Sequence, residues 1–204
     1  MSPPRRQLML FLLVVGVALS AIPAVNVVSQ REWAGSPQGL YGVDMVLPAF
    51  GNALRRVGVS AAPGEVVVGK SGWLFLGDHY EESVSVKRRP AGEGDLATAQ
   101  RFADQTKAWD RWYREHGVET WRILICADKD SIYPDLLPRW DRPVDGTATD
   151  LAIQRADSPI VVDSRPALRQ ARHAGGLPLY LRTDTHWTDG GAWVAYRALA
   201  QSWM

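Results

Sequence analysis

The chain has 204 residues, of which 46% are hydrophobic and 22% are charged, so a globular core is expected and wholesale disorder is excluded. The formal net charge of +1 gives no electrostatic argument for binding nucleic acid, and no such partner is expected. The one cysteine, Cys126, rules out an intrachain disulfide and a cysteine-based metal cluster. It follows the apolar residues 123–125 and is expected to pack inside a strand.

The first thirty residues carry a long apolar segment. No charged residue lies between Arg6 and Arg31, and residues 8–28 are almost continuously apolar. At ~1.5 Å per helical residue this segment reaches about 31 Å, close to the ~30 Å hydrocarbon core of a bilayer. Because Arg5 and Arg6 precede it, the positive-inside bias keeps that end in the cytoplasm. We therefore predict that residues 1–30 form a cytoplasmic stub and one transmembrane signal anchor.

This anchor predicts a single-pass protein of the inner membrane with the bulk of the chain in the periplasm. The alternative is a cleaved signal peptide, for which Ala18-Leu19-Ser20 offers a small-x-small cleavage site. Both hypotheses predict that the rest of the chain is exported. They differ only in whether the chain stays attached to the membrane.

Residues 31–63 are rich in Gly, Pro and Ser and are predicted to be a linker, with one short helix over residues 46–57. The compact domain is predicted to span residues 64–204. It opens with two predicted strands, 65–68 and 73–76, whose Gly-containing connection predicts a β-hairpin.

A long helix is predicted next, over residues 95–116, with Asp95 as its cap and Gly117 as its terminator. Its apolar face is predicted to consist of Leu96, Ala99, Phe102, Ala103, Thr106, Trp109 and Tyr113. A core strand is predicted within residues 119–127, and residues 128–134 are predicted to form a loop that leaves it.

The rest of the chain alternates between strands and helices. Strands are predicted at 160–162 and 179–181, a helix at 165–173 with Asp163 or Ser164 as its cap, and a final helix that begins at Thr188 or Asp189. This alternation predicts an α/β layered fold with a mostly parallel sheet. Active sites in such folds cluster at the carboxyl ends of the strands.

One of the four histidines lies at such a strand end. His186 follows the predicted strand 179–181 and precedes the final helix, and Asp184 is close enough to reach its ring through a tight turn. A carboxylate that holds one ring nitrogen fixes the tautomer and leaves the other nitrogen as a base for a hydroxyl nucleophile. By contrast, His116 and His173 are explained as residues at helix C-termini, which the helix dipole favours.

Two alternatives remain open for Asp184 and His186. Asp184 and Thr188 could instead cap the final helix, with His186 simply hydrogen-bonded. A metal site could also use Asp184, His186 and Asp189 as ligands. No second His or Cys cluster supports that site, so neither a metal nor a cofactor is expected.

Three separated segments carry a family resemblance: residues 67–78, residues 129–138, and residues 180–192 with the motif Asp184-Thr185-His186-Trp187. In this order they resemble the periplasmic SGNH-hydrolase-like proteins of alginate and related polysaccharide O-acetylation. The resemblance covers about residues 66–200. It implies an SGNH-hydrolase-like (flavodoxin-like) fold.

The resemblance also implies an acetyltransferase that works through a Ser-His-Asp site and an acyl-serine. Asp184 would orient the imidazole, and His186 would act as general base and then as general acid. The implied partners are a polysaccharide substrate and a membrane acetyltransferase that supplies the acetyl donor. Trp187, beside the histidine, could stack on a sugar ring.

The chain departs from the family pattern in one respect. The family's nucleophilic serine lies well downstream of the Asp-Thr-His-Trp motif, whereas Ser202 is the one serine after His186. Ser71, Ser131 and Ser164 lie upstream in turn or cap contexts. We therefore expect a fragment or an early-terminated copy, with a fold that is incomplete at its C-terminus and that supplies Asp and His but not the nucleophile. The alternative is a non-catalytic, membrane-tethered polysaccharide-binding or scaffold subunit of an export complex.

Overall fold

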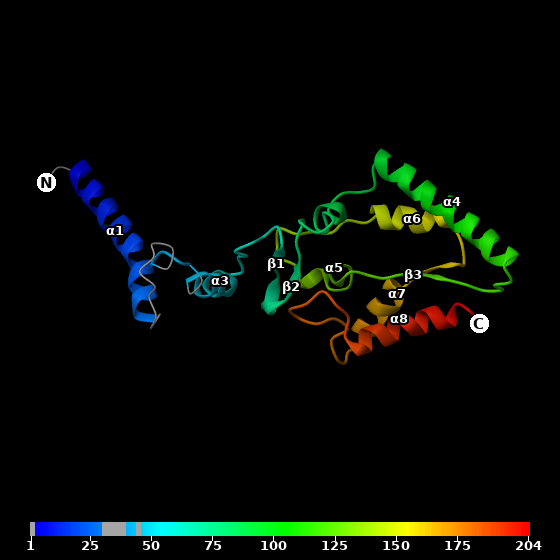
Figure 1. Ribbon diagram of the computed structural model, residues 1–204. Coiled ribbons are helices and arrows are strands. Elements are labelled where there is room, and N and C mark those ends of the chain that lie inside the picture. The colour runs from blue at the N-terminus through cyan, green and yellow to red at the C-terminus, as the bar shows by residue number, and fades with distance from the viewer. Residues whose placement is uncertain (1–2, 30–39, 44–45) are drawn as a thin grey trace. The chain divides into compact units, whose positions relative to one another are not determined.

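The computed structural model of the chain describes residues 3–29, 40–43 and 46–204. The chain divides into two compact units, Met1–Val57 and Gly58–Met204 (Figure 1). The second unit holds the domain that the sequence predicts from residue 64 onward. Residues 30–39 and 44–45 of the predicted linker lie outside the described residues.

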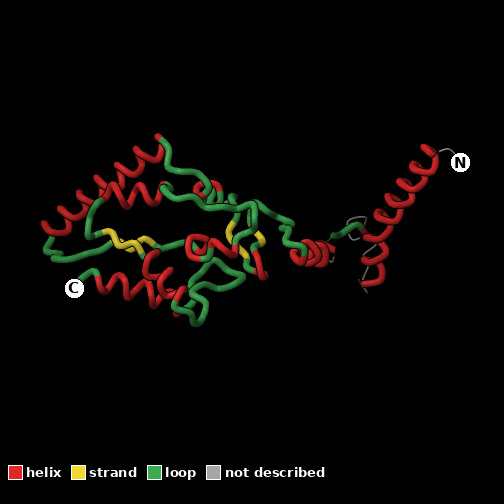
Figure 2. The backbone as a smooth tube through the Cα atoms, turned by 180° about the vertical axis from the view of Figure 1, so that it is seen from behind, coloured by secondary structure: helices red, strands yellow, loops and turns green. Residues whose placement is uncertain are grey.

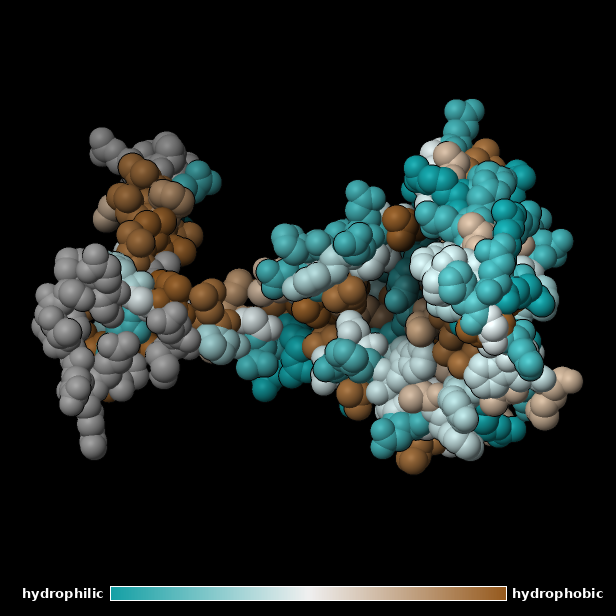
Figure 3. Space-filling view, turned by 45° about the vertical axis from the view of Figure 1, so that its right-hand side comes forward, coloured by the Kyte–Doolittle hydropathy of each residue, from teal (hydrophilic) through white to brown (hydrophobic). Residues whose placement is uncertain are grey.

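In the first unit the described residues include helices α1 (Pro3–Ser29) and α3 (Val46–Arg56). Helix α1 is long and apolar enough over Arg6–Val28 to cross a membrane, although a signal sequence has the same properties. Its side chains form a largely apolar surface, brown in Figure 3. Helix α3 confirms the short helix predicted over residues 46–57.

The second unit opens with the predicted hairpin. Strands β1 (Val66–Val68) and β2 (Leu74–Leu76) pair antiparallel, with Val67 opposite Phe75. A 3-10 turn, η1 (Lys70–Gly72), connects them, and Gly72 has a φ of +75° there, which a residue without a Cβ adopts at little cost. A second 3-10 turn, η2 (Ser85–Lys87), follows.

Helix α4 (Glu93–Glu115) begins two residues earlier than predicted. Its cap is Gly92, and Asp95 lies inside the first turn, where its carboxylate accepts the Gly92 N–H at 2.8 Å. The prediction of Asp95 as the cap is therefore wrong. Asp95 lies three residues inside the helix, and its side chain bonds back to the cap residue, Gly92. The predicted face is only partly buried: Ala99, Ala103 and Thr106 are buried, whereas Leu96 and Trp109 are exposed.

Helix α6 (Ala148–Ala156) is a helix that the sequence analysis missed, and it packs along α4. Thr147 caps it, since its hydroxyl accepts the Asp150 N–H while the Asp150 carboxylate accepts the Thr147 N–H at 2.8 Å. This reciprocal pair is a capping box, a signal that was present in the sequence.

The predicted parallel strands are β3 (Ile123–Ile125) and β4 (Val161–Asp163), with Ile125 opposite Asp163. Figure 2 shows the hairpin and this parallel pair as two short, separate sheets (yellow). Cys126 is exposed, contrary to prediction, because β3 ends one residue before it.

Short helical turns and two longer helices follow the strands. The predicted loop 128–134 contains α5 (Lys129–Ile132) and leads into η3 (Pro134–Leu136). Helices α7 (Arg165–His173) and α8 (Asp189–Gln201) lie where the sequence predicts them. The Ser164 hydroxyl does not cap α7. It donates to the Ile125 carbonyl at 2.8 Å and accepts the Ala127 N–H at 3.3 Å.

The predicted strand 179–181 does not join a sheet. Only Tyr180 forms a bridge, antiparallel to Trp187, because the chain folds back on itself after Leu181. Beneath this fold-back lies the buried apolar core, which draws residues from all three segments of the family resemblance: Val67, Phe75, Val84, Ala127, Ile132, Tyr133, Leu137, Leu168, Leu179 and Tyr180.

Candidate active site

The fold-back after Leu181 forms the loop that carries Asp184 and His186. The Leu181 N–H donates to the His186 carbonyl at 3.0 Å and the Thr188 N–H donates to the Leu179 carbonyl at 3.0 Å, so both ends of the loop are fixed. Helix α8 begins immediately beyond it. We name residues 181–188 the relay loop.

A close backbone approach fixes where α8 begins. The Thr188 hydroxyl accepts the Gly191 N–H at 3.2 Å and thereby caps the helix. A Cβ at Gly191 would collide with the Leu179 carbonyl, so this position needs glycine. The capping alternative is therefore confirmed for Thr188 and wrong for Asp184, whose carboxylate accepts the His186 N–H instead.

Asp184 and His186 face each other within the relay loop. The Asp184 Oδ1 lies 2.5 Å from the His186 Nδ1, and it also accepts the His186 main-chain N–H at 3.0 Å. These hydrogen bonds, the main-chain one first, hold the pKa of Asp184 below its usual value. Of the two tautomers of a neutral imidazole, an ionised Asp184 favours the one that carries its proton on Nδ1.

The other ring nitrogen of His186 is available. The His186 side chain is 80% exposed and that of Asp184 is 50% exposed. Among the residues that the structure describes, none hydrogen-bonds to the His186 Nε2. The geometry is therefore that of a carboxylate-oriented imidazole whose free nitrogen can take a proton from a hydroxyl group.

Lys129 lies beneath the relay loop, a position that the sequence analysis did not single out. Its side chain is buried, and its Nζ donates to the carbonyls of Leu181 at 3.1 Å, Arg182 at 3.5 Å and Asp184 at 2.7 Å. Burial lowers the pKa of Lys129 to about 8, although the charges of Asp184 and Asp130 oppose this. Lys129 lies four residues after the end of β3, and no local sequence pattern marks it as buried.

The hairpin contacts the relay loop from another direction. The Leu74 N–H donates to the Arg182 carbonyl at 3.0 Å, and the Arg182 guanidinium donates to the Ser71 carbonyl. The Lys70 Nζ in turn donates to the Asp135 carbonyl at 2.7 Å. The three separated segments of the family resemblance therefore meet around this loop.

Trp187 is partly buried and packs against the core. Its indole N–H donates to the Ala127 carbonyl at 3.4 Å, and its ring meets that of Tyr180 edge-on at 6.2 Å. The Tyr180 hydroxyl donates to the same carbonyl at 2.5 Å. These contacts give Trp187 a packing role, and its contact with a sugar stays a prediction.

None of the serines weighed from the sequence bonds to His186. Ser164 is fully buried between β3 and β4, and Ser71 lies in the hairpin turn with a φ of +54°. Ser202 follows α8, whose thirteen residues span about 20 Å, so it lies far from His186, which precedes that helix. Its hydroxyl instead accepts the Arg122 Nε–H at 3.2 Å.

The metal alternative finds no support in the described part of the chain. Nowhere in residues 3–29, 40–43 and 46–204 do three His, Cys, Asp or Glu side chains gather in a way that could hold a metal ion. The set Asp184, His186 and Asp189 is therefore not brought together as a ligand cluster.

A cavity of about 440 Å³ lies at the carboxyl ends of β3 and β4, where ligands bind in α/β folds. Charged and hydroxyl side chains line much of it, among them Lys87, Asp128, Asp130, Ser131, Arg165 and Arg169. Asp128 and Asp130 line this cavity, whereas Lys129 between them reaches the relay loop. The short helix α5 therefore contributes side chains both to this cavity and to the contacts beneath the relay loop.

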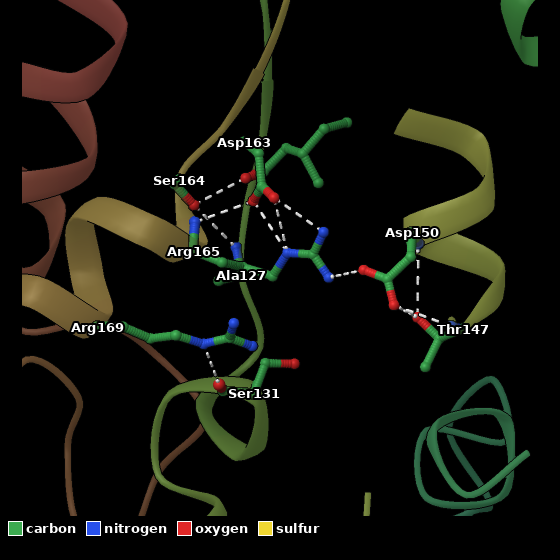
Figure 4. Close-up of polar contacts among 9 residues, drawn as sticks. Ala127, Ser131, Thr147, Asp150, Asp163, Ser164, Arg165 and Arg169 are labelled. Carbon is green, nitrogen blue, oxygen red and sulfur yellow. Dashed lines mark hydrogen bonds and ion pairs between the residues drawn. The ribbon is translucent and has the colours of Figure 1, made fainter. Parts of the chain in front are cut away.

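The cations of this cavity are mostly paired. Arg165 lies between Asp163 and Asp150, to which it donates at 2.8 and 2.6 Å (Figure 4). Lys87 lies 2.8 Å from both Asp128 and Asp130. Arg169 bonds only to a carbonyl in the described part of the chain, that of Ser131 at 3.2 Å (Figure 4). A ligand in this cavity would meet carboxylates and guanidinium groups together.

Comparisons with known proteins match the second unit. Residues 66–204 match the profile of a family described as an SGNH hydrolase-like domain, acetyltransferase AlgX. The chain is 31% identical over 141 residues to the "Probable alginate O-acetylase AlgJ" of Pseudomonas fluorescens. The matched region covers 67% of this chain and 33% of that protein. The protein of the same name from Pseudomonas aeruginosa is 35% identical over 137 residues, covering 62% of this chain and 30% of that protein.

A solved structure shares the fold. The O-acetyltransferase domain of Pseudomonas putida AlgJ matches with a TM-score of 0.50 and 26% sequence identity, covering 68% of this chain and 46% of that one. The chain spans about a third of the length of the curated relatives that it matches.

Proposed function

Because the chain belongs to the family of SGNH hydrolase-like acetyltransferase domains of AlgX, we propose that it acts in the O-acetylation of an exported, alginate-like polysaccharide. The observation that carries this proposal is the contact of 2.5 Å between the Asp184 Oδ1 and the His186 Nδ1, with Nε2 left free. The names of the relatives support the substrate class, since they are alginate O-acetylases.

In the proposed mechanism, Asp184 orients the imidazole and His186 moves the proton. The His186 Nε2 takes the proton of a serine hydroxyl while the serine oxygen attacks the carbonyl carbon of the acetyl donor. The donor then leaves with that proton, and an acetyl-serine remains. In the second half, Nε2 takes the proton of a sugar hydroxyl, the sugar oxygen attacks the acetyl-serine, and the serine leaves with its proton restored.

The proposal assigns two of the three groups to this chain. Asp184 and His186 supply the acid–base pair, and the nucleophilic serine is not assigned among residues 46–204. The proposed partners are the polysaccharide and a membrane acetyltransferase that supplies the acetyl donor. Helix α1 is proposed to anchor the chain in the inner membrane and to leave the domain in the periplasm, where an exported polymer is within reach.

Deleting the gene and restoring it with single variants tests this function in the cell that carries it. We expect deletion to remove the O-acetyl groups from the exported polysaccharide and the wild-type gene to restore them. The variant His186→Ala should leave acetylation near that of the deletion strain, because loss of a general base costs roughly 10²- to 10⁴-fold in rate. The measurement is the O-acetyl content of the purified polymer by NMR.

A matched histidine provides the control. His79 is exposed and lies outside the relay loop, so His79→Ala should restore acetylation fully. Immunoblots must show equal amounts of both variants. Full acetylation with His186→Ala would contradict the assigned base. If deletion still abolished acetylation in that case, the chain would act as a non-catalytic scaffold or polysaccharide-binding subunit.

A further inference from the structure

We propose that Lys129 is a positioning residue for the Asp184–His186 pair, because its ammonium group holds the main chain of the relay loop from below. This inference rests on the proposed function of the pair. Lys129 contacts neither the reacting nitrogen of His186 nor the Asp184 carboxylate, so its effect passes through the backbone.

The Lys129 ammonium group is surrounded by main-chain oxygens. Its three N–H donors face three carbonyls, those of Leu181 at 3.1 Å, Arg182 at 3.5 Å and Asp184 at 2.7 Å. All three belong to the relay loop, and the shortest contact is to the residue whose carboxylate holds the imidazole. The spacing of these carbonyls therefore depends on the ammonium group between them.

Burial makes these contacts obligatory for the lysine. Only 4% of Lys129 is exposed, and a buried charge is costly unless polar groups surround it. The rings of Trp73 and Phe75, with centroids 5.6 and 5.1 Å from Nζ, form its apolar surroundings. The loop carbonyls thus replace the water that the ammonium group has lost.

The relay side chains themselves have little other support. Asp184 and His186 are both exposed, and the Asp184 carboxylate accepts hydrogen bonds from the relay loop itself, namely from the main chain and ring of His186 and from the main chain of Thr185. Elsewhere the loop is fixed through Leu181, Arg182 and Thr188, on either side of the pair. Lys129 is the contact that fixes the main chain of Asp184 itself.

The tautomer of His186 reports on this positioning without any need for catalysis. We expect long-range ¹H–¹⁵N NMR spectra of the full chain in detergent micelles, with labelled histidines, to show the proton of the neutral ring on Nδ1. The His186→Gln variant assigns the signal among the four histidines. In Lys129→Met the main chain of Asp184 is no longer held. The spectra should therefore show a smaller share of the Nδ1–H tautomer, closer to the tautomer mixture of a free imidazole.

Two further variants separate positioning from a general effect on the fold. Lys129→Arg keeps the cation and should rescue the Nδ1 preference. Lys70→Met removes an exposed ammonium–carbonyl contact, to Asp135, that does not involve the relay loop, and should leave the tautomer unchanged. An unchanged tautomer in a folded Lys129→Met protein would overturn the proposal, whatever the outcome of the acetylation assay.

A pH series on the wild-type chain decides the matter if Lys129→Met does not fold. Burial lowers the pKa of Lys129 to about 8, and the charged groups that face it are Asp184 and Asp130. Raising the pH from about 7 to about 10 should therefore remove the ammonium charge and weaken the Nδ1 preference. A preference that persists unchanged after the ¹⁵N signal of the Lys129 side chain has titrated would count against the proposal.

Discussion

At the scale of single residues, Asp184 bonds twice to one neighbour, and both bonds favour its ionised form. Its pKa lies below the usual value, so any stability that these bonds contribute is present at neutral pH and is lost as the pH falls through that lowered pKa. A carboxylate, and not a carboxylic acid, therefore faces the imidazole under physiological conditions.

Lys129 makes stability change with pH in the same direction, but at higher pH. Its pKa is about 8 in the folded chain and 10.5 in an unperturbed lysine, so between these values the unfolded chain binds a proton that the folded chain does not. Unfolding then takes up a proton, and stability rises with pH in this interval by up to about 3 kcal/mol. In the same interval the relay loop loses its contact with the ammonium group. The domain as a whole still gains stability, because the cost of burying the charge is removed.

The titration of Lys129 predicts that the stability of the wild-type chain and that of Lys129→Met depend differently on pH. The free energy of unfolding of the wild-type chain should increase from pH 8 to about pH 10 relative to that of Lys129→Met, which has no group to titrate. Urea unfolding in detergent micelles, followed by tryptophan fluorescence, measures it. Parallel pH profiles of the two proteins would show that the lysine titrates with an ordinary pKa.

At the scale of secondary-structure elements, a buried hydroxyl links the two parallel strands. Ser164 is fully buried after β4, and its hydroxyl bonds the carbonyl of Ile125 and the N–H of Ala127 at the end of β3. The carbonyl of Ala127 in turn accepts from Tyr180 and Trp187. The end of β3 is therefore tied both to β4 and to the segment that enters the relay loop.

Ser164→Ala should therefore destabilise the domain. The substitution leaves the Ala127 N–H without its partner in a buried place, which costs roughly 1–3 kcal/mol. Thermal unfolding monitored by circular dichroism measures the loss. Thr149→Ala, on the exposed side of α6, is the matched control and should change stability by no more than about 0.5 kcal/mol. Equal midpoints for the two variants would mean that the hydroxyl contributes nothing.

At the scale of the whole molecule, the chain combines an apolar N-terminal helix with a domain of a known acetyltransferase family. The apolar stretch Arg6–Val28 spans about 35 Å as a helix, enough for the ~30 Å core of a bilayer. The proposed anchor would keep the proposed acetyltransferase domain beside the membrane, where an exported polymer emerges.

The anchor hypothesis predicts that the chain keeps its first thirty residues. Immunoblots of the expressed chain should show the same mass with and without a signal peptidase inhibitor, and the protein should fractionate with the inner membrane. A product shorter by about twenty residues, restored to full length by the inhibitor, would instead identify a cleaved signal peptide.

The family, the hairpin, the strands of the parallel pair and helices α7 and α8 could all be predicted from the sequence alone, and the comparisons confirm the family and the fold. These features follow from local patterns, namely apolar runs, turn residues and the motif Asp184-Thr185-His186-Trp187. Each pattern predicts its own helix, strand or turn from neighbouring residues, and the order of the patterns along the chain was enough to predict the family.

The residues that support the Asp184–His186 pair could not be predicted from the sequence and are known only from the folded chain. Lys129 precedes the relay loop by more than fifty positions, and no local pattern distinguishes a lysine that faces solvent from one that faces three carbonyls. The bonds of the buried Ser164 hydroxyl to Ile125 and Ala127, almost forty positions away, likewise depend on contacts between distant segments. Burial and hydrogen-bond partners depend on which segments meet, and that is settled only when the chain packs.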